Sequence, residues 1–372
     1  MLTLRMKVGA AVLFGSTAVA PLAAQDIPGA LIPTANQPPT RQGTRGANFL
    51  QLGVGARAIA MAGSATGYVS GPDSWYWNPA GGASMERFGI AASRQNLYDD
   101  LDIAHNYVAL GLPALGGVFG LHVIALNSGD LTRTTEASPL GDDPTLGTTF
   151  TWNATAVGAS YARRLTDRLA LGATVKFVSE GISDATAKWA AVDLGTQFQT
   201  GIYGLTLGAS LSNLGPSSHM RGSLVKREVN TDDFSNQLTD VNFDTRETEL
   251  PTLFRFSLAS ELYGTTSSLW GAGGGSHQVL GELAVSDAID TDVQAAIGLE
   301  YAWRDILFVR GGKRFYNDDR DVGESSSIAY GLSGGFGVRL PVSGRGLRFD
   351  YAYTALGDQL QNIQVFSIEF GR

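Results

Sequence analysis

From residue 86 onward the chain alternates apolar side chains with small or polar ones, over segments of about ten residues. In Asp292–Arg304, Ile297 and Leu299 fall on one side of an extended chain, whereas Gly298 and Glu300 fall on the other. Because the side chains of a β-strand point alternately to its two faces, such a segment is a strand with one apolar and one polar face. No stretch after the first 24 residues approaches the roughly 18 consecutive apolar residues that a membrane helix requires. The pattern is typical of strands that cross a membrane as a barrel.

Fourteen such segments can be counted, and bacterial membrane barrels have an even number of strands. The connections between them are alternately long and short, except at 263–276 and 287–291. Membrane barrels have long loops outside the cell and short turns on the periplasmic side, so this alternation supports the count. We predict an all-β fold, a transmembrane antiparallel β-barrel of about 14 strands with an N-terminal plug. The strand centres are expected near Ile90, Val108, Leu121, Ala156, Ala173, Val192, Leu207, Phe256, Gly281, Ile297, Phe308, Leu332, Phe349 and Phe366.

The first residues predict a secretory signal peptide. Arg5 and Lys7 precede the apolar run Val8–Val19, and small residues follow as far as Ala24. This order of charged, apolar and small-residue regions favours a signal peptide over a buried helix. The predicted organisation is a signal peptide at Met1–Ala24, an irregular extension at Gln25–Asn48, a plug at Phe49–Met85 and a barrel at Glu86–Arg372.

Phe49–Met85, which we call the plug, differs from the strands that follow. Its first half is rich in Gly and Ala, and its second half is a turn that carries Trp75, Tyr76 and Trp77. Small side chains allow close backbone contact, and the prolines rule out a continuous strand. We expect the aromatic residues to pack the plug against the wall, although they could instead contact a hydrophobic ligand. The residues expected to have structural or gating roles are Gly53, Gly55, Asp73, Trp75, Trp77, Asn78, Pro79 and Gly81.

The segments Phe49–Gly63 and Trp77–Gly81 (WNPAG) resemble the N-terminal signature of the PorV/PorQ family, relatives of the FadL-type outer-membrane transporters. The chain departs from the family pattern at Gly71–Ser74 and at Gly82. The resemblance implies a FadL-like barrel in the bacterial outer membrane with no enzymatic activity. It also implies an accessory role in protein export or surface attachment, as in type IX secretion, with secreted proteins as partners. The FadL relationship implies the alternative, passive transport of small hydrophobic molecules.

The last segment ends with alternating apolar residues, Phe366, Ile368 and Phe370. This terminus resembles the C-terminal signal through which outer-membrane barrels are recognised by the barrel-assembly machinery, although Gly371 and Arg372 follow the last aromatic residue. An ordinary amphipathic last strand would show the same pattern. The expected partners are outer-membrane lipid and the assembly machinery, with secreted proteins or a small hydrophobic ligand, and we expect a monomer.

Several kinds of chemistry are disfavoured by the sequence. The net charge of −8 argues against nucleic acid, and the absence of cysteine excludes disulfides and thiolate sites. The four histidines lack the spacing of a metal site. Ser333 lies in a G-x-S-x-G match, but within an alternating segment rather than the strand-to-helix turn that this motif requires in hydrolases. An outer-membrane hydrolase is therefore the least favoured of three functions, and no catalytic residue, cofactor or metal is predicted.

The polar faces of the predicted strands carry charges of both signs. They could line a selective path, but we expect them to pair with each other and with the plug, as buried charges require. The connections 127–150 and 215–249 are the longest, and loops of this length are commonly functional or disordered. The inward-facing charges are expected to be Lys176, Asp193, Arg255, Glu261, Glu282, Glu300, Arg304, Arg310, Arg339, Arg348, Asp350 and Glu369.

Overall fold

The computed structural model describes residues 43–97, 103–136, 138–141, 148–230, 238–242, 245–271, 276–316, 330–342, 344–355 and 362–371. The chain divides into two units, residues 1–40 and 41–372, and all described residues belong to the second. The predicted signal peptide and residues 25–42 of the predicted extension therefore lie outside the described residues.

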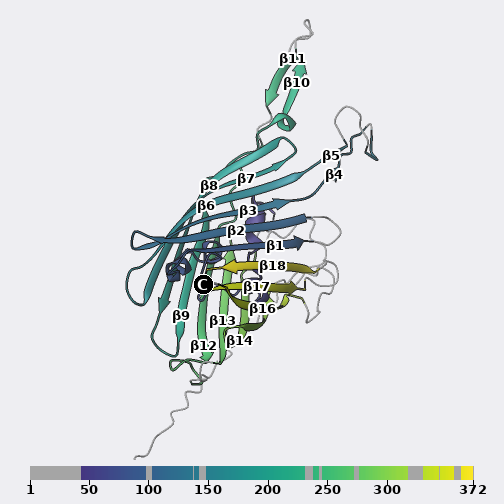
Figure 1. Ribbon diagram of the computed structural model, residues 1–372. Helices are drawn as coiled ribbons and strands as arrows, with labels where there is room; N and C mark the ends of the chain where they lie inside the picture. The colour runs from purple at the N-terminus through teal and green to yellow at the C-terminus, as the bar shows by residue number, and fades with distance from the viewer. Residues whose placement is uncertain are drawn as a thin grey trace, which may run out of the picture. The chain divides into compact units, whose positions relative to one another are not determined.

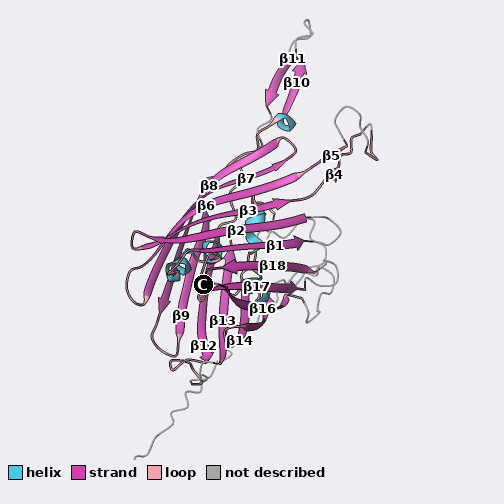
Figure 2. Cartoon of the chain, in the orientation of Figure 1, coloured by secondary structure: helices cyan, strands magenta, loops and turns pink. Residues whose placement is uncertain are grey.

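Fourteen strands form a single closed antiparallel barrel (Figures 1 and 2), which confirms the predicted fold class and strand count. Each barrel strand pairs with the barrel strands that precede and follow it in the chain, and the last pairs with the first. The strands are β1 (Gly89–Leu97), β2 (Ile103–Ala114), β3 (Gly117–Asn127), β6 (Trp152–Arg164), β7 (Leu169–Ile182), β8 (Ala185–Gln199), β9 (Leu205–Leu214), β12 (Leu253–Tyr263), β13 (His277–Ala288), β14 (Gln294–Trp303), β15 (Leu307–Phe315), β16 (Leu332–Val342), β17 (Arg345–Thr354) and β18 (Ile363–Phe370).

Two small hairpins occupy the two longest connections, where the sequence analysis anticipated no strands. β4 (Leu131–Thr132) pairs with β5 (Thr149–Phe150), and β10 (Lys226–Asn230) pairs with β11 (Leu238–Asn242). A 3₁₀ turn, η3 (Ser223–Val225), precedes β10. These hairpins are not paired with the barrel strands in the sheet order.

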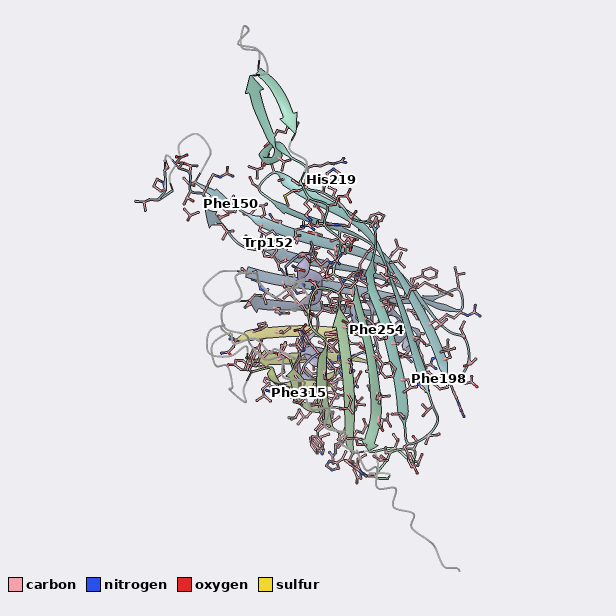
Figure 3. All side chains as sticks on the ribbon, turned by 180° about the vertical axis from the view of Figure 1, so that it is seen from behind. Phe150, Trp152, Phe198, His219, Phe254 and Phe315 are labelled. Atoms are coloured by element: carbon pink, nitrogen blue, oxygen red, sulfur yellow. The ribbon has the colours of Figure 1, made fainter. Side chains whose placement is uncertain are left out.

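The predicted faces of the strands are confirmed by exposure. Leu299 and Phe349 are 48% and 46% exposed, whereas their neighbours Glu300 and Arg348 are 7% and 5% exposed. Figure 3 labels three other side chains of the outer face, Phe198, Phe254 and Phe315, which are also exposed. One predicted inward charge is wrong: Arg304 follows the end of β14, is exposed, and lies over the ring of Trp303.

The connections 263–276 and 287–291 break the alternation of long and short connections, but the strands predicted on either side of them are all present. β12, β13 and β14 are all present and paired in order. The longer connection folds back on the strand it follows, because the backbone N–H groups of Leu269 and Trp270 donate to the carbonyls of Glu261 and Leu262. A folded-back connection can be long and still remain at the short-turn end of a barrel.

The plug contains only short helical turns, as its glycines and prolines predict. They are η1 (Asn48–Gln51), α1 (Ala56–Ala60), α2 (Ser74–Trp77) and η2 (Pro79–Ser84). η2 contacts β3, β6, β7 and β8, and α1 contacts β15–β18, so the plug reaches wall strands far apart in the strand order. Among the described residues, no helix is long and apolar enough to cross a membrane.

Candidate functional site

The plug lies directly against inward-facing glycines of the barrel wall. At Gly312 of β15, an added Cβ would lie 2.4 Å from the carbonyl carbon of Met61, and at Gly208 of β9 it would lie 2.5 Å from the Cα of Gly67. No real Cβ tolerates such distances, so each of these positions admits the plug only because it has no side chain. The wall glycines that a Cβ would bring within 3 Å of plug atoms are Gly89, Gly111, Gly120, Gly172, Gly195, Gly208, Gly298, Gly312 and Gly335. We call these the seat glycines.

The sequence analysis missed the seat glycines, although a signal for them was present. Each lies at a position of its strand that the alternation assigns to the inner face. Gly311 and Gly334 have the opposite parity, and an added Cβ there would meet nothing closer than 4.0 and 3.7 Å, respectively. Glycine at these inward positions therefore marked places where the plug lies against the wall, whereas the inward glycines Gly158 and Gly337 meet side chains of the wall itself.

The aromatic residues of α2 hold the two halves of the plug together. Trp77 Nε1 donates to the Val54 carbonyl at 2.9 Å, and the Tyr76 hydroxyl donates to the Leu50 carbonyl at 2.8 Å. Trp75 is fully buried, and its Nε1 donates to the Leu110 carbonyl of β2 at 3.0 Å. These side chains are packed and hydrogen-bonded, which favours a packing role over contact with a ligand.

Asn78 connects the turn of the plug to the wall. Its Nδ2 donates to the Thr66 carbonyl at 2.8 Å and to the Thr196 carbonyl of β8 at 2.9 Å. Its Oδ1 accepts from the Ala80 N–H at 3.2 Å, which caps η2, while Pro79 occupies the first position of that turn. A proline suits this position because the first N–H groups of a helical turn have no partner within the turn. The turn predicted at Trp77–Gly81 is thus fastened to the wall by its own asparagine.

The three predicted glycines of the plug have different constraints. Gly53 and Gly55 have φ of +78° and +74°, values that disfavour residues with a Cβ. At Gly55, an added Cβ would also lie 2.4 Å from Oδ2 of Asp73. Gly81 is limited by space, since its Cβ would lie 2.3 Å from the Val69 carbonyl oxygen.

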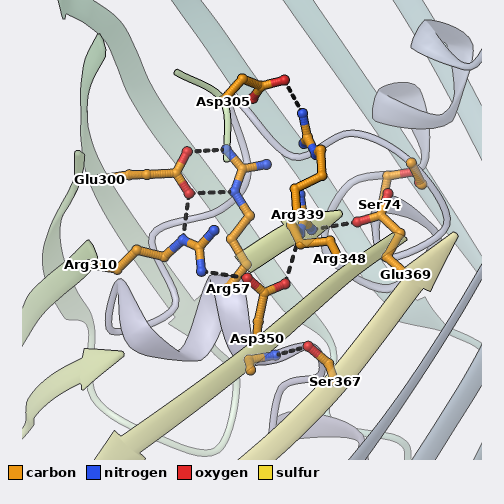
Figure 4. A network of polar contacts seen from close by, with 12 residues as sticks. Arg57, Ser74, Glu300, Asp305, Arg310, Arg339, Arg348, Asp350, Ser367 and Glu369 are labelled. Carbon is orange, nitrogen blue, oxygen red and sulfur yellow. Dashed lines mark hydrogen bonds and ion pairs between the residues drawn. The ribbon is translucent and has the colours of Figure 1, made fainter. Parts of the chain in front are cut away.

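A network of buried ion pairs joins α1 of the plug to strands β14, β15, β17 and β18, on the side of the barrel where α1 packs (Figure 4). Arg57 makes two hydrogen bonds of 2.8 Å to the carboxylate of Glu300 on β14. Glu300 also accepts from Arg310 on β15, which pairs with Asp350 on β17 at 2.7 Å. Arg348 then bridges Asp350 and Glu369 of β18. Charges buried at this depth are stable only when paired in this way.

The inward charges therefore pair with each other and with the plug, as predicted. Lys176 pairs with Asp193 at 2.8 Å, and Glu282 accepts from the Gly67 N–H at 2.7 Å. Arg255 lies over the rings of Tyr76 and Trp77, with its guanidinium 5.2 and 5.1 Å from the two centroids.

Asp73 lies at the edge of the same network, in the plug rather than in a barrel strand. Its carboxyl is buried, and burial, together with the negative charge of Glu369, raises its pKa to about 7. The ordinary pKa of an aspartate is near 4. Asp73 is therefore the group of the plug whose charge changes near neutral pH.

Cavities flank the plug rather than forming one wide space. A pocket of about 250 Å³ is lined by Ser70, Pro72, Met85, Arg87 and Phe370, among others. A smaller cavity of about 20 Å³ lies beside Tyr68 and Asp73, and another of about 50 Å³ lies beside Arg57 and Arg339. The two smaller cavities are of the size of one or a few water molecules.

The remaining candidate residues show no catalytic arrangement. Ser333 lies in β16, and its Oγ is 3.0 Å from Oγ1 of Thr354 on the neighbouring strand. No group of three or more metal-binding side chains occurs within the described residues. Phe366 and Ile368 are 52% and 39% exposed on the outer face of β18, and Phe370 lies beneath the guanidinium of Arg345. Their role in recognition by the assembly machinery stays a prediction.

Three solved channel structures resemble this barrel. They are the toluene transporter TodX of Pseudomonas putida, the toluene transporter TbuX of Ralstonia pickettii and the monoaromatic hydrocarbon channel CymD. The sequence identities are 11%, 13% and 12%, and each match covers 86% of this chain and 97% of the other, with a TM-score of 0.52. The chain shares the barrel fold of these channels. No family model and no curated protein sequence matches the chain.

Proposed function

We propose that this protein is a non-enzymatic channel of the bacterial outer membrane that passes small hydrophobic molecules by passive diffusion. The observation that carries the proposal is the barrel architecture, which this chain shares along most of its length with transporters of toluene and other monoaromatic hydrocarbons. The exposed apolar outer face of the strands supports the location, because a barrel with this face requires lipid around it.

We further propose that the plug controls passage. The pocket of about 250 Å³ beside the plug can hold an aromatic hydrocarbon, but the cavities beside Asp73 and Arg57 are too small for one, so we propose that a ligand moves past the plug only when plug contacts open. The two ends of the plug are held by different strands, η2 by β3, β6, β7 and β8 and α1 by β15–β18, so one end can open while the other remains attached. The export role implied by the PorV/PorQ resemblance stays a prediction, and no contact among the described residues favours it over transport.

A reversible disulfide crosslink between the plug and the barrel wall tests this proposal. An added Cβ at Gly67 of the plug would lie 3.1 Å from the Cβ of Ala259 on β12, which is close to the separation of a disulfide after a small shift. Because the chain contains no cysteine, the double variant Gly67→Cys/Ala259→Cys forms one defined crosslink. The assay is the initial rate of radiolabelled toluene uptake by host cells that otherwise lack the protein, with glycerol as the polar control.

We expect the wild-type protein to raise toluene uptake and leave glycerol uptake at the level of the empty vector. Oxidation of the double variant should abolish the increase, and reduction should restore it, while the single variant Ala259→Cys should respond to neither treatment. Toluene uptake equal to that of the vector would refute transport. Uptake that persists in the crosslinked protein would refute control by the plug.

A further inference from the structure

A groove of about 570 Å³ lies on the outer face of the barrel, across the wall from the turn of the plug at Asn78 and Pro79. It crosses β6, β7, β8, β9 and β12, and Phe254, labelled in Figure 3, lies at one end of it. The volume is within the range of small-molecule sites. Its lining on the outer face includes Tyr161, Arg163, Leu171, Ala173, Leu194 and Phe254.

Strand register explains why the surface is hollow here. Across β6 to β8, Tyr161 is paired with Ala173, which is paired with Leu194. One row lower, Thr196 of β8 is paired with Ala209 of β9. Side chains paired across strands stand next to each other on one face, so small residues between large ones leave a depression. Its floor is alanine and threonine, and its rim is leucine and aromatic.

One end of the groove is positively charged. Arg163 lines the groove at the end of β6, and Arg164 and Arg168 are in or next to the turn that follows. Arg163 is exposed and forms no ion pair or side-chain hydrogen bond with any other described residue. The turn from β6 to β7 is short, which places it at the periplasmic end of the barrel. Residues 163–168 contain three arginines and one aspartate, Asp167, a local excess of positive charge in a chain with a net charge of −8.

We infer that this groove binds one anionic phospholipid of the periplasmic leaflet, such as phosphatidylglycerol. An acyl chain fills the depression between Leu171, Leu194 and Phe254, and the phosphate is bound by the guanidinium of Arg163. An arginine at the end of a membrane strand extends its charge to the headgroup level while its methylenes stay on the apolar surface. Guanidinium groups bind phosphate oxygens through charge-assisted hydrogen bonds. The positive charge of Arg163 at one end of an apolar groove therefore matches a lipid that has apolar chains and a negative headgroup.

The test is lipid binding to the full-length barrel, purified in detergent and stripped of lipid, measured by native mass spectrometry. The probes are phosphatidylglycerol, phosphatidylcholine and palmitate. Arg163→Ala should weaken phosphatidylglycerol binding about fivefold, the effect of removing one cation near a headgroup. Ala173→Leu, which fills the floor, should weaken binding of both phospholipids. Arg304→Ala and Ala159→Leu are the matched controls, because both positions are exposed and lie outside the groove.

Slower migration on heating, checked for each variant, shows that the barrel is folded. Phosphatidylglycerol binding that is unchanged in both groove variants would overturn the inference, as would palmitate binding as tightly as phosphatidylglycerol. Loss of a dimer in Ala173→Leu, with lipid binding intact, would show instead that a second copy of the chain covers this face. The inference requires a barrel in a membrane but not the proposed transport, so failure of toluene uptake would leave it standing.

Discussion

Replacing the seat glycine Gly312 by alanine is expected to displace the plug. The added Cβ would lie 2.4 Å from the Met61 carbonyl carbon and 2.8 Å from the Ala62 nitrogen. Both contacts are with backbone, so no change of rotamer relieves them. Excess volume of this kind in a packed interior costs typically about 1–3 kcal/mol. That cost changes the ratio of displaced to seated plug by roughly 5- to 150-fold, since each 1.4 kcal/mol is a factor of ten.

The assay is conductance in planar bilayers, with wild-type protein and the two adjacent variants Gly312→Ala and Gly311→Ala. Gly311 faces outward on the same strand, and an added Cβ there would meet its nearest atom at 4.0 Å. We expect frequent openings with Gly312→Ala and wild-type behaviour with Gly311→Ala. Equal conductance of the two variants would refute the assignment of Gly312 as a seat for the plug.

Three further predictions concern the network and the faces of the barrel. Arg57→Ala removes one of the two buried partners of Glu300 but leaves Arg310 in place, so it should destabilise the seated plug by about 1.5–3 kcal/mol, seen as protease cleavage within Phe49–Met85; unchanged resistance would contradict this. Because the pKa of Asp73 is raised to about 7, its burial becomes unfavourable as pH rises from about 4 to 7. The plug should therefore be held most firmly below that window, and Asp73→Asn should remove the dependence of conductance on pH; a wild-type conductance that does not change across the window would refute the role of Asp73. Leu299→Arg should impair insertion by roughly 2–4 kcal/mol, measured by heat-modifiable migration, whereas Leu299→Met should not, and equal insertion would show that this face is not exposed to lipid.

Strand number and the faces of the strands could be predicted from the sequence, because both depend on local alternation. A lipid-facing position such as Leu299 must be apolar regardless of which strand lies beside it. The turn at Asn78 and Pro79 was also evident locally, from residues that punctuate the chain. The hairpins within the long connections were missed, because short strands such as Leu131–Thr132 carry too few residues to show a period.

The sequence by itself determined a barrel of fourteen amphipathic strands and a segment unable to join its wall. Only the tertiary structure decided how that segment is held. Arg57 meets Glu300 across 243 positions of the chain, and Met61 meets Gly312 across a similar separation. The closure of β1 on β18 and the path of the plug inside the barrel decide which inward charges pair. They also decide which wall glycines lie against the plug. Those are non-local facts, and a pattern with a period of two residues carries no information about them.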